Sequence, residues 1–404
     1  MKRALVALAT VLALPSMLLA QTGTPPFGSF EHGGFDIVNR GNLNANFSIP
    51  IMSNPGRGQG VRFAIVYDSL IWQKTGSAWT PVVDQSGNPT WGWRKDAPKG
   101  KTTWKVSLGR LLNCGSFWDY EIVWRNYAYT DIGGTRHPFS KLVKYNPCTD
   151  TYTGFGAGHA TDKSGYRLTV NSDPYSPIIE NPIGEKITVS EIVTDTNGNY
   201  VQKTVNGSTT DWKDTLGNVV VQIVKRTSNC QPSGGPTYPE CYDYIYKSAD
   251  GQSRTATLYL DSFHVKTNFA CSGVTEYNQT GKLLPVRLDL PNGRLYTFSY
   301  EATPQDTGKV TGRIKRVTLP TGGYYEYRYP GSNPSVDHNG INCTDTFPVD
   351  MTRAINESGT GTEREWKFVR TQVGSDWKTR ITPASLSYDS GVANESTFTF
   401  SSTG

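Results

Sequence analysis

Apolar and polar residues alternate along most of this chain, in short runs separated by turn-forming residues. Strand-like runs occupy 42–52, 62–73, 101–112 and 118–130, and each leads into Gly, Asn, Pro or Asp. Hardly any segment repeats its apolar residues at helical spacing. A period of two is typical of strands, and short consecutive strands without helices favour hairpins over parallel sheets. The pattern therefore predicts an all-β fold of antiparallel hairpins and meanders.

A turn pattern, Asp-Thr-x-Gly-Asn, occurs at 195–199 and again at 214–218, nineteen residues later, with strand-like runs on either side. Aspartate can cap such a bend through its side chain, and glycine adopts the positive φ that other residues resist. The spacing fits two strands and two turns, so the pattern predicts hairpins. The turn residues are Asp195, Gly198, Asp214 and Gly217.

A longer repeat follows, because residues 290–300 recur as 319–329 at a constant offset of twenty-nine. Each copy has a Pro-x-Gly turn and then aromatic residues at every second position, which places them on one face of a strand. One hairpin cannot bury that face alone, whereas stacked neighbours can form a continuous sheet with one apolar side. The turn residues are Pro291, Gly293, Pro320 and Gly322, and the aromatic ladders comprise Tyr296, Phe298, Tyr300, Tyr325, Tyr327 and Tyr329.

These repeats resemble the Rhs/YD-repeat family. Residues 312–329, Gly-Arg-Ile-x-x-Val-x-Leu-Pro-x-Gly-x-x-x-x-Tyr-x-Tyr, look like its repeat unit, and the Asp-Thr-x-Gly-Asn turns look like a variant form. The segments 26–30, 36–43 and 49–51 are similar to the start of large exported members. The resemblance covers about two thirds of the chain.

The resemblance implies a long β-sheet ribbon that spirals into a hollow shell. In bacterial members the shell encloses a carboxy-terminal toxin or enzyme, in animal members it serves cell adhesion, and the shell itself is not a catalyst. This chain departs from the family because its repeats are few and irregular, and no Asp-Pro-x-Gly segment ends a core. Since residues 397–400 are strand-like, we expect the strands to continue beyond this fragment.

The amino terminus reads as a secretory signal peptide. A basic start, Met1-Lys2-Arg3, precedes an apolar run that ends at Ala20 and contains Pro15. Such a run is too short and too interrupted for a membrane span, so we expect cleavage near Ala20, no span afterwards, and a secreted or cell-surface protein. The predicted division is 1–20 signal peptide, 21–173 amino-terminal β-domain, 174–330 repeat region and 331–404 further β-strands.

Composition and charge narrow the range of partners. The chain has 22 Tyr and 41 Gly but only 4 Met, which suits strands joined by tight turns. Its 40 Lys and Arg against 35 Asp and Glu are scattered singly and do not gather into the basic patches of nucleic-acid binders. We expect no nucleic-acid partner. The expected partners are the chain's own carboxy-terminal continuation or a cargo domain, and cell-surface proteins or glycans.

Six cysteines lie far apart in a chain that we expect to be exported, where disulfides are the default. Two of them flank a loop rich in Pro and Gly and could close a hairpin. Six cysteines allow fifteen pairings, and sequence alone does not decide among them. No two cysteines have the close spacing of a zinc site. The pairs considered first are Cys230–Cys241, Cys114–Cys148 and, as the remainder, Cys271–Cys343.

Residues with catalytic potential form no recognisable group. The five histidines stand in unrelated contexts, and no Gly-x-Ser-x-Gly nucleophile turn occurs. Asp195, Asn197 and Asn199 offer oxygen ligands for calcium, but the glycine position and the missing acidic twelfth residue favour a hairpin turn. We assign no catalytic residue, cofactor or metal ligand, and a secreted hydrolase fragment is the least supported function.

Aromatic residues suggest one other function. Trp91, Trp93, Trp118 and Trp124 could form a stacking surface for sugar rings if they face solvent, although aromatics more often fill β-cores. That arrangement would make the protein a carbohydrate-binding or adhesive β-module. The leading hypothesis is a non-enzymatic exported scaffold of Rhs/YD type. Such a scaffold would form part of a shell or cell-surface interaction surface, with toxin encapsulation or contact-dependent delivery as possible roles.

Overall fold

The computed structural model describes residues 30–32, 34–54, 61–83, 87–95, 100–131, 136–190, 192–330, 340–383 and 395–400. The predicted signal peptide lies outside these residues. Within them the chain forms strands and turns but no helix, and the strands pair almost entirely antiparallel. The predicted all-β class is therefore confirmed.

A five-stranded sheet, in the order β1-β2-β3-β4-β7, opens the fold. Alternate residues of β4 point to one face, so that Phe63, Ile65 and Tyr67 are buried together, and Val66 on the other face is buried as well. A separate hairpin, β5-β6, follows β4. The bounds are β1 Phe30–His32, β2 Asp36–Asn39, β3 Ala45–Asn54, β4 Val61–Asp68, β5 Trp72–Thr75, β6 Ala78–Pro81 and β7 Trp93–Arg94.

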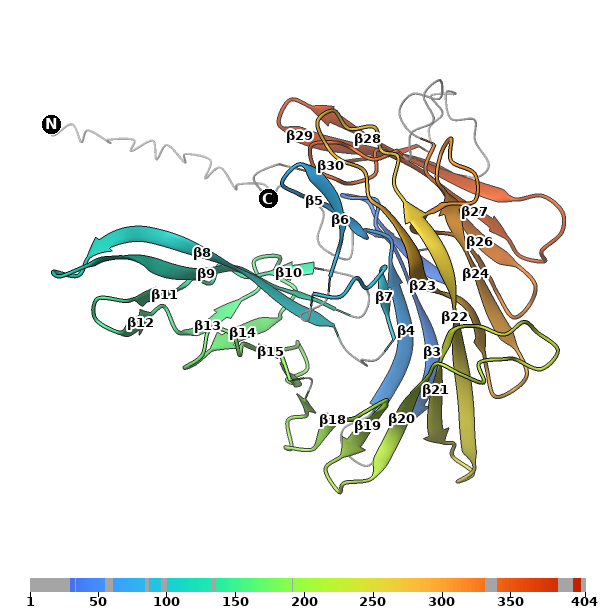
Figure 1. The fold of residues 1–404 in the computed structure, drawn as a ribbon, viewed down its shortest axis with the longest axis horizontal. Helices are drawn as coiled ribbons and strands as arrows, with labels where there is room; N and C mark the ends of the chain where they lie inside the picture. Colours follow the sequence, from blue (N-terminus) through green and yellow to red (C-terminus); the bar gives the residue numbers. More distant parts are fainter. Residues whose placement is uncertain are drawn as a thin grey trace, which may run out of the picture.

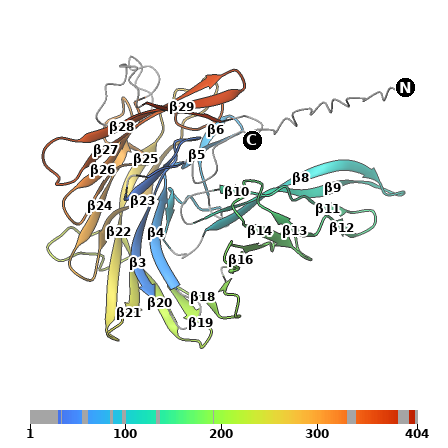
Figure 2. The same ribbon diagram turned by 180° about the vertical axis from the view of Figure 1, so that it is seen from behind.

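A second sheet forms an arm that projects from the body of the molecule, as both ribbon views show (Figures 1 and 2). Its two long strands, β8 and β9, have thirteen residues each. β9 lies between β8 on one side and β10 and β11 on the other. The bounds are β8 Lys101–Asn113, β9 Trp118–Thr130, β10 Arg136–Pro138, β11 Val143–Asn146 and β12 Thr151–Thr153.

The remaining eighteen strands, β13 to β30, form one sheet in unbroken chain order, which we call the ribbon. Each strand pairs antiparallel with its sequence neighbours. The bounds are β13 Gly156–His159, β14 Arg167–Val170, β15 Ile178–Glu180, β16 Lys186–Thr188, β17 Val193–Thr194, β18 Tyr200–Asn206, β19 Thr209–Asp214, β20 Val219–Arg226, β21 Glu240–Lys247, β22 Ser253–Lys266, β23 Asn278–Asp289, β24 Leu295–Ala302, β25 Val310–Thr318, β26 Tyr324–Arg328, β27 Asp350–Asn356, β28 Arg364–Val373, β29 Asp376–Thr382 and β30 Ser396–Phe400.

The ribbon curves around the amino-terminal sheet, and one core joins the two (Figures 1 and 2). Trp93 of β7 donates from Nε1 to the Tyr300 hydroxyl of β24 at 3.1 Å. The backbone N–H of Ile314 donates to the Tyr67 hydroxyl at 2.8 Å. These buried polar groups find partners across the interface, as burial demands. The amino-terminal sheet thus fills the apolar face of the ribbon from β18 onward, whereas the buried residues of β14 to β16 pack against the arm.

The aromatic ladders form part of this core. Phe298 pairs with Val317 across β24 and β25, and Val317 pairs with Tyr325 across β25 and β26. These side chains therefore form one row across three strands. Phe35 of the amino-terminal segment contacts this row, with ring centroids 5.1 Å from Tyr325. Of the predicted ladder residues, Phe298, Tyr300, Tyr325, Tyr327 and Tyr329 are buried, and Tyr296 is partly buried against the same core.

The predicted turn residues lie at hairpin turns. The Asp195 carboxylate accepts from the backbone N–H of Asn197 and of Asn199, both at 2.8 Å. Asp214 makes the corresponding bonds in the next turn. The glycine of each turn, and of each Pro-x-Gly turn after Pro291 and Pro320, adopts a positive φ: Gly198 83°, Gly217 81°, Gly293 77° and Gly322 91°.

The ribbon does not follow the predicted division of the chain. It begins at Gly156, within the predicted 21–173 domain, and passes through the boundary at 173/174 between β14 and β15. It also crosses the boundary at 330/331, because β26 pairs with β27. The regular turn motifs that suggested these boundaries mark hairpins within a sheet that extends further in both directions.

Candidate binding surface

The arm presents an apolar face, which its strand register creates. Val106 pairs with Trp124, Leu108 with Ile122, and Leu111 with Tyr120. Cross-strand partners in an antiparallel pair point to the same side of the sheet. Trp118, two residues before Tyr120, extends the row to the end of the hairpin. We call this row the arm face: Val106, Leu108, Leu111, Trp118, Tyr120, Ile122 and Trp124.

A β-bulge keeps Leu108 and Leu111 on the same face although they are three residues apart. The register shifts between them, so that Gly109 and Arg110 lie opposite one residue, Glu121. A Cβ atom at Gly109 would lie 2.6 Å from a carboxylate oxygen of Glu121. A side chain at this position would have to displace that carboxylate and would crowd Val123, so glycine suits the bulge. Without it, Leu111 would turn to the other face.

The end of the arm face is open to solvent. Leu108 is 67% exposed and Trp118 is 63% exposed, and Phe117 in the adjoining loop is 50% exposed. Six of the fourteen exposed large apolar side chains in the described residues fall between 106 and 120. Exposed apolar residues are normal when scattered, whereas a contiguous group marks an interaction surface. We call residues 108–120 the arm tip.

The base of the arm face is covered by aromatic rings. Trp124 is buried, with its ring centroid 5.4 Å from that of Tyr175 and 6.0 Å from that of Tyr152. The Trp104 ring centroid lies 6.2 Å from that of Tyr175. Tyr152 and Tyr175 are themselves half exposed, so the aromatic surface continues from the tip toward the body.

A disulfide holds the arm tip in place. Cys114 at the end of β8 is bonded to Cys148 in the turn between β11 and β12. The tip loop is closed by a hydrogen bond from the Cys114 N–H to the Phe117 carbonyl at 2.9 Å. On the opposite face, Lys144 pairs with the buried Glu121 at 3.3 Å. The exposed apolar residues are thus presented on a fixed support.

The predicted tryptophan surface for sugars does not form as a unit. Trp91, Trp93 and Trp124 are buried, and only Trp118 faces solvent. Trp91 and Trp93 belong to the core between the amino-terminal sheet and the ribbon. The residues around them in sequence do not reveal this long-range packing. The exposed aromatic neighbours of Trp118 are Phe117 in the adjoining loop and Tyr120, two residues along the same strand.

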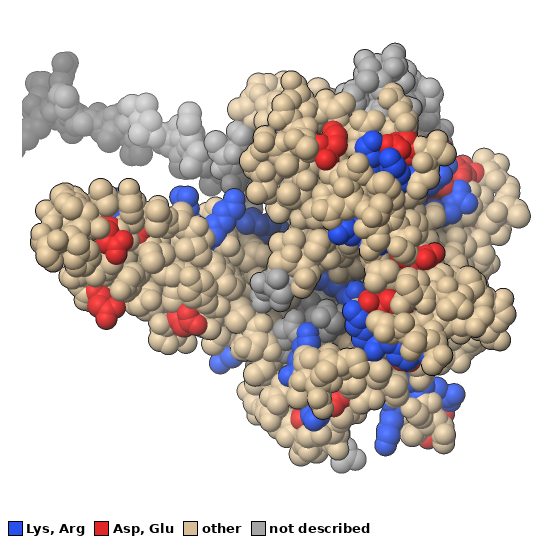
Figure 3. Space-filling model, viewed as in Figure 1, with Lys and Arg blue, Asp and Glu red and all other residues tan. Residues whose placement is uncertain are grey.

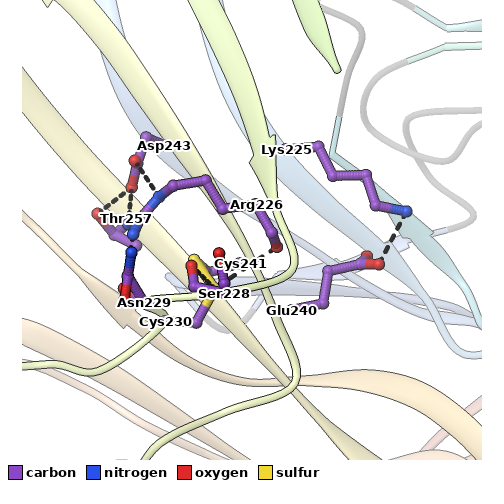
Figure 4. The surroundings of a disulfide bond; sticks show 9 residues. All are labelled: Lys225, Arg226, Ser228, Asn229, Cys230, Glu240, Cys241, Asp243 and Thr257. Atoms are coloured by element: carbon purple, nitrogen blue, oxygen red, sulfur yellow. Dashed lines mark hydrogen bonds and ion pairs between the residues drawn. A yellow bond between two sulfur atoms is a disulfide. The ribbon is translucent and has the colours of Figure 1, made fainter. Parts of the chain in front are cut away.

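The other predicted pairs and ladders are structural. All six cysteines form disulfides, Cys114–Cys148, Cys230–Cys241 and Cys271–Cys343, so the three pairs considered first are confirmed. Figure 4 shows the second, which closes a loop between β20 and β21. Beside it, Arg226 forms a two-bond contact with Asp243, which also accepts from the Thr257 hydroxyl. Three disulfides are characteristic of an exported or surface protein.

A cleft of about 870 Å³ lies where the arm meets the body, and Lys and Arg gather around it (Figure 3). Several of these basic side chains contact other residues of the chain. Lys225 pairs with Glu240 at 2.8 Å (Figure 4), and the Lys95 ammonium lies 4.4 Å from the ring centroid of Tyr242. The first contact joins β20 to β21 within the ribbon, and the second joins the segment after β7 to the ribbon. The cationic lining is Arg94, Lys95, Lys101, Lys203, Lys225 and Lys282.

A buried histidine lies near the base of the arm. His137 is bonded through Nδ1 to Asp162 at 2.7 Å and contacts Asp131 through Nε2 at 3.4 Å. Its ring stacks on Tyr166 at a centroid distance of 4.1 Å. Burial opposes the charged form, but the hydrogen bonds to Asp131 and Asp162 outweigh it, so the pKa of His137 is raised. Sequence spacing could not reveal this group, because its members come from three separate segments.

We expect His137 to make folding pH-dependent. Because the fold raises its pKa, its stabilising contribution is complete below the unfolded pKa of about 6.5 and is lost as pH rises through the folded value. Urea unfolding between pH 5 and pH 9 should show this loss in the parent protein. His137→Asn should remove it, whereas the exposed His159→Asn should not. An identical pH profile for all three proteins would contradict the expectation.

Other kinds of site are not evident in the described part of the chain. There, no three His, Cys, Asp or Glu residues lie close enough together to hold a metal ion. Among the same residues, no helix is long and apolar enough to cross a membrane.

Comparison with protein-family models and with curated proteins gives no match. Among solved structures, the chain is similar to a porin-like protein from Bacteroides uniformis at 10% sequence identity and a TM-score of 0.24. The match covers 65% of this chain and 93% of that chain. A likeness with so low a TM-score carries no argument, so the function rests on the chain's own residues.

Proposed function

We propose that this protein is a non-enzymatic, exported β-repeat scaffold of Rhs/YD type, which forms part of a shell or of a cell-surface interaction surface. The observation that carries the proposal is the ribbon, whose strands follow chain order through β13 to β30. A sheet that grows by one hairpin after another can be lengthened without changing its topology. That property suits a shell or an extended support.

The amino-terminal sheet supports a role as the closed end of such a ribbon. It occupies the apolar face, where Asp36, Tyr67 and Trp93 bond to ribbon residues. This part of the ribbon is therefore filled. Any cargo, including a toxin domain, would lie against later strands, and the chain's own continuation is its proposed partner there.

Export is the second part of the proposal. The three disulfides agree with an oxidising compartment. The leader from Met1 to Ala20 has the composition of a signal peptide. We place the mature protein outside the cell or on its surface.

The arm is the proposed contact surface of the scaffold, since its tip combines projection, exposed apolar residues and a disulfide support. The test uses mature protein, residues 21–404, labelled and incubated with intact bacterial and animal cells. Leu108→Glu/Trp118→Glu should lower cell retention at least about tenfold, the loss expected when two anchor residues are removed. Retention is measured by flow cytometry.

The control variant replaces two exposed apolar residues outside the arm with glutamate. Leu216 and Val219 are exposed apolar residues at the turn between β19 and β20, so Leu216→Glu/Val219→Glu should leave retention unchanged. Equal retention of all three proteins would show that the arm is not part of the contact surface. No retention of the parent protein on any cell type would count against an interaction role.

A carbohydrate-binding module is the second candidate, favoured by the exposed pair Trp118 and Tyr120 on one side of β9. Aromatic rings can stack on sugars through their apolar faces. A glycan array probed with the parent protein and with Trp118→Ala would show a signal that depends on the indole if this candidate holds.

A further inference from the structure

The arm tip has the chemistry of a lipid interface. Its exposed side chains combine aliphatic residues, Leu108 and Leu111, with the aromatic residues Phe117, Trp118 and Tyr120. Trp and Tyr favour the boundary between lipid and water, because each has an apolar body and one polar group. Aliphatic side chains add area that a bilayer can cover but that a sugar ring does not require.

Two polar side chains of the tip are used within it. The Asn113 side-chain oxygen accepts from the Gly115 N–H at 2.9 Å, and an oxygen of Asp119 accepts from the Tyr120 N–H at 2.7 Å. A glycan site places hydrogen-bonding groups around its stacking ring to fix orientation. Here these groups instead stabilise the loop, which favours a lipid surface over a sugar as the occupant.

The shape of the arm allows the tip to reach a plane. In both ribbon views the β8–β9 hairpin extends away from the body (Figures 1 and 2). Leu111 and Tyr120 form a cross-strand pair two or three residues from the loop, which is about 7–10 Å at 3.3 Å per residue. Interfacial elements enter a bilayer to a depth of about 5–10 Å. The outer part of the tip therefore matches the depth of the interface.

Charge beside the tip indicates which lipid. β8 carries Lys105 and Arg110 on the tip side and no acidic residue, whereas Lys101 lies at the base of the arm and donates to the Val83 carbonyl. On β9 the acidic residues are Asp119, which caps the Tyr120 N–H, and the buried Glu121, which pairs with Lys144. Asp150, next to the disulfide in the β11–β12 turn, accepts from the Tyr145 hydroxyl. Basic residues next to an apolar anchor are attracted to anionic headgroups. The disulfide to Cys148 holds the apolar residues outward, so little order is lost on binding.

We propose that the arm tip is a peripheral docking site for a lipid bilayer with anionic headgroups. This inference rests on the proposed role of the arm as the contact surface of the scaffold, and it names the partner of that surface. Leu111, Phe117, Trp118 and Tyr120 enter the interface, Arg110 contacts the headgroups, and Lys105, further along β8, adds to the positive charge of the strand.

The test is flotation of the mature protein, residues 21–404, with unilamellar vesicles. One set contains phosphatidylcholine alone, and the other contains phosphatidylcholine with phosphatidylglycerol at a molar ratio of about 7:3, chosen to give an anionic surface. The parent protein should float with the anionic vesicles. Leu108→Glu/Trp118→Glu should reduce the bound fraction at least about tenfold, and Leu216→Glu/Val219→Glu should match the parent.

A second variant separates charge from apolar contact. Lys105→Gln/Arg110→Gln keeps the arm face and should lose most of the preference for phosphatidylglycerol, so that binding to the two vesicle sets becomes similar. Both positions are exposed on β8, so we expect folding to be preserved, and thermal unfolding of each variant checks this.

The outcomes distinguish this inference from the proposed function. If the parent protein floats with neither vesicle set, or if the tip variant floats as well as the parent, lipid docking is wrong. If cell retention still depends on the tip in that case, the contact surface stands and its partner is a glycan or a protein. If neither cells nor vesicles respond to the tip variant, both proposals fail.

Discussion

Replacing Asp36 with asparagine is expected to lower the free energy of unfolding by about 3–5 kcal/mol, because it leaves a buried guanidinium without its carboxylate. Asp36 on β2 and Arg353 on β27 have side chains that are 0% and 1% exposed. Arg353 Nη1 lies 3.4 Å from one oxygen of Asp36, and the Tyr327 hydroxyl donates to the other at 2.9 Å. The carboxylate thus joins the amino-terminal sheet to two strands of the ribbon.

Three comparisons isolate this effect in urea unfolding. Arg353→Met combined with Asp36→Asn should recover part of the loss, because no unpaired charge then remains. Glu357→Gln breaks a pair with Arg364 in which both side chains are more than half exposed, and it should cost less than about 1 kcal/mol. If Asp36→Asn costs no more than Glu357→Gln, the buried pair does not hold the sheets together.

The sequence predicts most of the local structure, because local structure depends on neighbouring residues. Alternation identifies the strands, and the Asp195 and Asp214 turns are read from motifs whose hydrogen bonds stay within five residues. The ladders are also correctly placed on one face. What covers that face could not be predicted, since Tyr327 meets Asp36 across 291 positions in sequence.

Burial is the property that the sequence predicts least well. Trp91 and Trp118 are both aromatic residues near turns, yet one is buried and the other is mostly exposed. The difference depends on whether a second layer covers the strand, which is a long-range property. The arm could have been suspected from its two long strands joined by a four-residue connection, Cys114 to Phe117. The exposure of these strands could not have been predicted, because a similar alternation of residues in β4 forms part of the core.

Breaking the Cys271–Cys343 disulfide is expected to destabilise the protein more than breaking either of the others. A cross-link restricts the unfolded chain more strongly when it closes a longer loop. The separations are 72 residues for this pair, 34 for Cys114–Cys148 and 11 for Cys230–Cys241. Loop entropy then gives a loss of about 4.4 kcal/mol for the longest loop and about 2.8 kcal/mol for the shortest.

Urea unfolding of the double serine variants measures this order. Cys271→Ser/Cys343→Ser should have the lowest free energy of unfolding, and Cys230→Ser/Cys241→Ser the highest of the three. Both cysteines of the shortest loop are fully buried, whereas Cys271 is nearly so, so serine burial would push the order the other way. The longest loop can therefore rank as the most costly only if chain entropy outweighs the burial of polar serine, and the reverse order would show that local packing decides the contribution of each bond.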